Sequence, residues 1–175
     1  MNSDCKTMRR LGVFLMVLVL LLSGCKMTVS LSGGNVDPRA KTVSIATFPN
    51  NSTLINPTLS QEFTTALKNM VQNQTPLTIV NGGRADYAIE GEIVNYTISP
   101  VAIQGDDKAA MNRLTITVNV RFTDSFDEEK SFEQMFSRYA DYASTANFSS
   151  VEGTLVTTIN EALTDDIFNK AFVNW

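Results

Sequence analysis

The residues with the clearest chemistry in this sequence are Leu22-Ser23-Gly24-Cys25. Small residues before a cysteine give a peptidase access to the backbone, and the cysteine sulfur then forms a thioether with diacylglycerol. Basic residues and an apolar run from Leu11 to Leu22 precede this motif, and the run has about twelve residues where a membrane-spanning helix needs roughly twenty. The pattern predicts a lipoprotein signal peptide over residues 1–24, with Cys25 as the site of lipid attachment.

The N-terminal segment leaves some alternatives open. A plain secretory signal with a chance cysteine, or a short membrane anchor, has a similar apolar run. The start is either Met1 or Met8, because Met8-Arg9-Arg10 already forms a complete basic region. Cys5 is lost with the signal and Cys25 carries lipid, so a mature monomer of about 150 residues has no disulfide and depends on its hydrophobic core.

The lipid also predicts a location. Two or three acyl chains on Cys25 anchor a protein to a membrane stably, whereas one chain does not. Lys26 follows the cysteine, and in enteric-type bacteria only Asp at that position favours retention in the inner membrane. We therefore expect an outer-membrane lipoprotein that faces the periplasm.

The inventory of side chains excludes several classes of function. The chain has no histidine and only 2 cysteines, which excludes Ser-His-Asp and Cys-His nucleophilic sites as well as the usual zinc sites. The balance of 14 basic and 18 acidic residues gives a net charge of −4, which is unfavourable for binding nucleic acid. Asp106-Asp107 lacks a third carboxylate at a spacing that would close a cation site. The sequence predicts no catalytic residue, no metal site and no cofactor.

Apolar residues at helical spacing predict two helices. The first runs from Thr58 to Gln74, and Asn56-Pro57-Thr58 with Gln61 forms a start signal of the capping-box type. The second starts at a capping box of Ser149 and Glu152 and runs to about Phe172. Each apolar stripe is wide enough to cover one side of a sheet.

Alternating or β-branched residues predict the strands. The clearest alternation is in the strand Leu114–Phe122, and a one-residue phase change near Ile93-Val94 predicts a β-bulge in the strand that begins at Tyr87. A long hairpin loop, Pro100 to Asn112, joins these two strands. The other expected strands are Val43–Phe48, Leu77–Val80 and a segment with Phe132, Phe136 and Tyr139 that is also compatible with a helix.

These elements predict an α+β fold, a two-layer sandwich in which two helices cover one face of a mostly antiparallel sheet of about four to five strands. Residues 25–41 are a lipidated tether with a candidate edge strand, and residues 42–175 form a single α+β domain. The sequence does not order the strands. Two helices cover only one face, so the opposite face must be polar or must be covered by something else. The residues that fit an open polar face are Thr115, Thr117, Asn119 and Arg121, with Glu90 and Glu92 from the neighbouring strand.

The sequence resembles the LptE family of lipopolysaccharide-assembly lipoproteins. Besides the cysteine motif, the resemblance lies in four segments, whose order and spacing cover nearly the whole mature chain. They are Lys41-Thr42-Val43-Ser44-Ile45 leading into Phe48-Pro49-Asn50-Asn51, Asn56-Pro57-Thr58-Leu59-Ser60-Gln61, Ala88-Ile89-Glu90-Gly91-Glu92-Ile93, and Leu114-Thr115-Ile116-Thr117-Val118-Asn119-Val120-Arg121-Phe122.

The resemblance implies a non-enzymatic protein that plugs the LptD β-barrel, supports its assembly and helps lipopolysaccharide reach the outer leaflet. Four polar-face residues, Thr115, Thr117, Asn119 and Arg121, are then expected to contact the barrel. In the family, a basic residue of the long hairpin loop and another before the last helix contact lipid. In this sequence the tip of the hairpin loop has one basic residue, Lys108, and the segment before the last helix, Tyr142 to Ser150, has none. The remaining candidates for lipopolysaccharide contact are Arg113 and Arg138.

Two other function classes stay open. Activators that dock on a peptidoglycan synthase also combine a lipidated cysteine, a tether and an α/β body, although the short tether here is unfavourable for crossing the periplasm. An enzyme would need a pocket with convergent polar groups, such as a buried pair of carboxylates.

Overall fold

The computed structural model describes residues 36–54, 56–82, 84–101 and 110–173. Two predicted site residues, Cys25 and Lys108, lie outside these residues. So do the candidate edge strand of the tether and the tip of the long hairpin loop.

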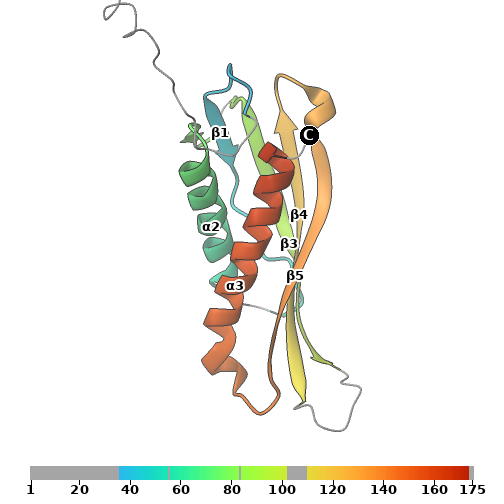
Figure 1. Ribbon diagram of the computed structural model, residues 1–175. Helices are drawn as coiled ribbons and strands as arrows, with labels where there is room; N and C mark the ends of the chain where they lie inside the picture. The colour runs from blue at the N-terminus through green and yellow to red at the C-terminus, as the bar shows by residue number, and fades with distance from the viewer. Residues whose placement is uncertain (1–35, 55, 83, 102–109, 174–175) are drawn as a thin grey trace, which may run out of the picture. The chain divides into compact units, whose positions relative to one another are not determined.

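Five strands form one open sheet in the order β2-β1-β3-β4-β5 (Figure 1). The strands are β1 (Thr42–Ile45), β2 (Thr78–Val80), β3 (Tyr87–Val101), β4 (Met111–Asp124) and β5 (Phe132–Ala143). The three long strands β3, β4 and β5 pair antiparallel, whereas β1 runs parallel to both of its neighbours. The predicted α+β class is confirmed, and the ambiguous last segment is a strand.

Two helices lie on the same side of this sheet (Figure 1). Helix α2 (Leu59–Gln74) connects β1 to β2, as a parallel pair of neighbouring strands requires. Helix α3 (Phe148–Phe168) follows β5 and continues into a π-helical turn, η2 (Asn169–Val173). None of the helices in the described part of the chain is long and apolar enough to span a membrane.

Both predicted capping boxes are wrong. Thr58 makes no side-chain cap on α2; instead Oδ1 of Asn56 accepts hydrogen bonds of 3.0 Å from the backbone N–H groups of Thr58 and Leu59. The N-cap of α3 is Asn147, two residues before the predicted cap at Ser149, and Oδ1 of Asn147 accepts a hydrogen bond from the N–H of Ser149. The carboxylate of Glu152 does not cap the helix and instead accepts hydrogen bonds from side chains outside α3.

The predicted β-bulge is confirmed, since the register between β3 and β4 shifts between Ile93 and Asn95. The bulge has a consequence for the faces of β3. Ile89 and Ile93 before it and Tyr96 after it are all buried, although Tyr96 is an odd number of residues from Ile93. The extra residue in the bulge shifts the phase of the alternation by one. Polar side chains of β3 therefore lie on the same face of the sheet before and after the bulge.

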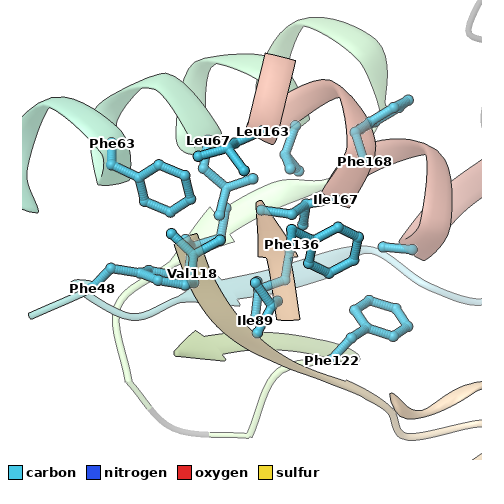
Figure 2. Packing of buried hydrophobic residues seen from close by; sticks show 14 of the residues in the cluster. Phe48, Phe63, Leu67, Ile89, Val118, Phe122, Phe136, Leu163, Ile167 and Phe168 are labelled. Carbon is cyan, nitrogen blue, oxygen red and sulfur yellow. The ribbon is translucent and has the colours of Figure 1, made fainter. Parts of the chain in front are cut away.

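The hydrophobic core lies between the sheet and the two helices (Figure 2). Phe48 packs edge-to-face against Phe63 of α2 with ring centroids 5.0 Å apart, and its ring also lies over Gly91 of β3. A Cβ at Gly91 would be 2.5 Å from the Phe48 ring and 2.1 Å from the backbone oxygen of Asn119, so only glycine fits there. At the other end, Tyr87 and the buried ring of Phe172 pack together.

Candidate partner-binding face

The sheet surface that faces away from the two helices is lined mainly by polar side chains. Alternation along β4 places five apolar residues against the helices, all 0–1% exposed, and the intervening residues on the opposite surface. Residues paired across neighbouring strands share a face of the sheet. The register therefore identifies the residues of β3 and β5 that lie on the same surface. We call this surface the polar face and define it by Glu90, Glu92, Asn95 and Thr97 of β3, Arg113, Thr115, Thr117, Asn119 and Arg121 of β4, and Glu133, Met135, Ser137, Tyr139 and Asp141 of β5.

One end of the polar face is organised around Glu133. Its Oε2 accepts hydrogen bonds of 3.1 and 3.0 Å from Nε and Nη2 of Arg121, and its Oε1 accepts a 3.1 Å bond from Nδ2 of Asn119. The bond from Asn119 and the ion pair with Arg121 lower the pKa of Glu133. This carboxylate is therefore ionised at neutral pH, and its charge is balanced within the sheet.

The other end is organised around Arg113. Its Nε and Nη2 donate hydrogen bonds of 2.7 and 2.8 Å to the two carboxylate oxygens of Asp141, and this pairing lowers the pKa of Asp141. The guanidinium carbon of Arg113 also lies 3.6 Å from the ring centroid of Tyr139. The bidentate ion pair and the cation–π contact hold the Arg113 side chain along the sheet surface.

Hydroxyl groups occupy the middle of the polar face. Oγ1 of Thr117 and Oγ of Ser137 are hydrogen-bonded at 2.9 Å across β4 and β5, and Thr115 lies one pair further along β4. A hydroxyl group both donates and accepts hydrogen bonds, so these side chains can bond to a donor or to an acceptor on another molecule. The face thus has balanced charges at its ends and adaptable hydrogen-bonding groups between them.

A hollow of about 290 Å³ opens on the polar face beside the segment that follows β1. It is lined by Pro49, Glu90, Gly91, Glu92, Asn119, Arg121 and Glu133. Nδ2 of Asn51 donates a 2.6 Å hydrogen bond to Glu92 nearby. Within the described ranges, no group of three or more Cys, Asp or Glu residues is arranged to hold a metal ion. The hollow is lined mainly by polar side chains that can form hydrogen bonds with another molecule.

The predicted site residues separate into three groups. The structure brings together Thr115, Thr117, Asn119 and Arg121 on the polar face, with Glu90 and Glu92 beside them and Arg113 at one end. Arg138 is on the other surface of the sheet, where its guanidinium forms an ion pair with Asp166 of α3. Cys25 and Lys108 lie outside the described residues.

Sequence reasoning missed the contribution of β5 to this face. Phe132, Phe136 and Tyr139 look like one apolar set, but along a strand Tyr139 is on the side opposite to Phe136. Met135 and Tyr139 are exposed on the polar face, at 67% and 56%, whereas Phe136 is buried. Counting even and odd positions along this expected strand would have separated Tyr139 from Phe136.

Comparison with known proteins places the chain in a family. No curated protein matches it. Among solved structures, a minor lipoprotein from Acinetobacter baumannii has a TM-score of 0.51 at 16% identity, covering 75% of this chain and 91% of that one. The hypothetical protein CT253 from Chlamydia trachomatis has a TM-score of 0.55 at 12% identity, covering 76% and 98%. The rare lipoprotein B from Shewanella oneidensis has a TM-score of 0.49 at 12% identity, covering 73% and 90%.

The two structures with the higher scores show a shared fold. A family model described as "LptE: Lipopolysaccharide-assembly" matches residues 40–171, which span β1 to η2 and include the whole polar face. This chain therefore belongs to the LptE family of lipopolysaccharide-assembly lipoproteins.

Proposed function

We propose that this protein is a non-enzymatic, lipid-anchored lipoprotein of the outer membrane that docks inside an LptD-type β-barrel through its polar face. The observation that carries the proposal is the polar face itself: a broad hydrogen-bonding surface on one side of the sheet, with both helices on the other. The lumen of a large outer-membrane barrel is lined by polar side chains. A surface of hydroxyl, amide and paired charged groups is complementary to such a lumen.

The internal ion pairs favour docking. Burying an unpaired charge in an interface is costly, and this cost falls when the charge already has a hydrogen-bonded partner. Arg113 and Arg121 each bring a carboxylate partner, Asp141 and Glu133, from the neighbouring strand. These charges can be covered by the barrel without losing their partners, while Thr115 and Thr117 are available for new hydrogen bonds.

The lipid on Cys25 supports the same proposal. Stable anchoring keeps the protein at the membrane that contains the barrel, which raises the effective concentration of each partner near the other. A short tether between Cys25 and the described domain is sufficient when the partner lies in the same membrane.

Two of the three candidate residues for lipopolysaccharide contact are already paired with carboxylates. Arg138 is bound by Asp166 and Arg113 by Asp141, so an anionic lipid would compete with a carboxylate at either residue. Lys108 in the hairpin loop is the remaining candidate. Lys108→Asp is expected to weaken binding of purified lipopolysaccharide, and an unchanged affinity would remove Lys108 from the contact.

Affinity purification from detergent-solubilised outer membranes tests the proposed partner. The unmodified protein is expected to retain an LptD-type barrel in stoichiometric amount. Thr117→Lys, at the centre of the polar face, is expected to reduce retention strongly without a matching loss of melting temperature. Thr157→Lys is the matched control, because Thr157 is exposed on α3. Equal retention by both variants, or recovery of a peptidoglycan synthase in place of the barrel, would contradict the proposal.

A further inference from the structure

Asn81 and Gly82 form the single Asn-Gly pair of the sequence, and they follow β2 directly. The side-chain amide of an asparagine can be attacked by the backbone nitrogen of the next residue. That nitrogen then forms a bond to Cγ, ammonia leaves, and a five-membered succinimide ring results. A side chain on the next residue hinders the attack and restricts the backbone, so glycine at that position permits the reaction best.

The structure leaves both reacting groups of this pair unprotected. Asn81 and Gly82 are exposed and lie beyond the end of the strand. Gly82 has a φ of 72°, and nothing lies within 4 Å of the position that its Cβ would occupy. In the part of the chain that the structure describes, neither the Asn81 side chain nor the N–H of Gly82 forms a hydrogen bond. The Asn81 amide can therefore turn toward the Gly82 nitrogen without breaking a bond.

Asn51 shows how the same chain protects a comparable pair. Asn51 is also exposed, and a small residue, Ser52, follows it. Nδ2 of Asn51 donates a 2.6 Å hydrogen bond to Oε2 of Glu92, and the N–H of Ser52 donates a 3.1 Å bond to Oδ1 of Asn50. Both the amide and the attacking nitrogen are thus held in bonds that must break before a ring can form. Tertiary structure therefore separates the two sites, in addition to the difference between glycine and serine.

We propose that Asn81 is a site of spontaneous deamidation in the folded protein. The Gly82 nitrogen loses its proton and bonds to Cγ of Asn81 as the amide leaves as ammonia. Water then opens the succinimide ring at one of its two carbonyl groups, which gives either aspartate or isoaspartate. The reaction consumes one water and releases one ammonia, and it needs no oxidant, reductant or enzyme.

The product has a defined effect on its surroundings. Asn81 lines a hollow of about 560 Å³ between α2 and β2, and Lys68 of α2 lines the same hollow. Deamidation replaces a neutral amide by a carboxylate there, which attracts the lysine ammonium group. Isoaspartate also adds a methylene group to the backbone at the end of β2. Strand β1 separates β2 from the strands of the polar face, so this modification does not depend on the proposed docking to a barrel.

Peptide mapping by mass spectrometry tests the proposal. The purified, folded lipoprotein is incubated in mildly alkaline buffer and then digested. The peptide that contains Asn81 is expected to show the mass shift that replaces an amide NH₂ by OH, and to separate into an aspartate and an isoaspartate form. The peptide that contains Asn51 is expected to keep its mass. Asn81→Gln should abolish the shift, because its longer side chain would have to form a six-membered ring, whereas the matched control Asn51→Gln should leave modification of Asn81 unchanged.

Unfolding separates the effect of structure from that of sequence. In guanidinium chloride the bonds that protect Asn51 are lost, so Asn51 is expected to react as well, while the rate at Asn81 changes little. Two results would overturn the proposal: an intact Asn81 in the folded protein when the unfolded sample has reacted, or equal modification of Asn51 and Asn81 in the folded protein. Neither result involves the barrel, so failure here would leave the proposed function standing.

Discussion

The hydroxyl of Tyr96 on β3 donates a 2.6 Å hydrogen bond to Oε1 of Glu152 in the first part of α3. The same oxygen accepts a 2.8 Å bond from Nδ2 of Asn56, whose own Oδ1 caps α2. Burial of the ring and the bond to Glu152 raise the pKa of Tyr96 above its ordinary value. The phenol therefore stays protonated, and one carboxylate joins the sheet to the starts of both helices.

Removal of this hydroxyl is expected to lower stability. Tyr96→Phe leaves the packing of the buried ring intact but removes a hydrogen bond to a charged group, which costs about 1–2 kcal/mol. Urea denaturation should show a lower midpoint with an unchanged m-value. Tyr139→Phe is the control, since Tyr139 is 56% exposed, and its midpoint should stay close to that of the unmodified protein. Equal midpoints for both variants would show that the Glu152 contact does not stabilise the fold.

A pair of glycine substitutions should have opposite effects. Gly91→Ala brings a Cβ against the Phe48 ring and the Asn119 backbone, and overpacking of this kind costs about 1–3 kcal/mol. Gly153→Ala lies within α3 with nothing inside 4 Å of the new Cβ, so it is expected to stabilise by about 0.5–1 kcal/mol. Denaturation curves measure both changes. A neutral Gly91→Ala would contradict the close packing of Phe48 on β3.

The Asp86 carboxylate predicts a loss of stability in acid. Its Oδ2 accepts hydrogen bonds from the N–H of Lys41 and from the N–H and hydroxyl of Thr42, and these bonds lower the pKa of Asp86. A lowered folded-state pKa gives stability that is present above the unfolded pKa of about 3.9 and is lost as the pH falls through the folded value.

Asp86→Asn should therefore lower the melting temperature at neutral pH and reduce its fall below about pH 4. Thr42→Val removes one donor and is expected to act in the same direction by a smaller amount. Thermal melts between pH 7 and pH 2 measure both profiles. Other carboxylates keep some pH dependence in the variant, including Asp37, whose bonds to Arg39 lower its pKa to about 2. An unchanged profile for Asp86→Asn would show that Asp86 does not couple folding to protons.

Membrane attachment is expected to depend on Cys25. Cys25→Ala removes the sulfur that carries the lipid, so the protein should leave the membrane fraction or stay attached only by an uncut signal. Cys5→Ala is the matched control, because Cys5 lies within the predicted signal peptide. Cell fractionation with labelled palmitate measures both. Acylated mature protein in the Cys25→Ala variant would contradict the assignment.

The alternation of side chains along β4 was readable from the sequence. Side chains of an extended chain alternate with a period of two, so a row such as Thr115 and Thr117 must share a face whatever else the chain does. The helix periodicity, the bulge after Ile93 and the family resemblance followed in the same way from local spacing. The main elements of the fold and the centre of the polar face could therefore be predicted.

The spacing of residues within one segment does not show which residues from distant segments will contact it. Arg113 and Arg138 look alike as isolated strand arginines, yet Asp141 holds one on the polar face and Asp166 holds the other beside α3. The same holds for Glu152, which bonds to Tyr96 instead of capping its own helix. Only tertiary structure determined these contacts and the position of β1 between β2 and β3, because pairing between distant segments depends on the packing of the whole sheet.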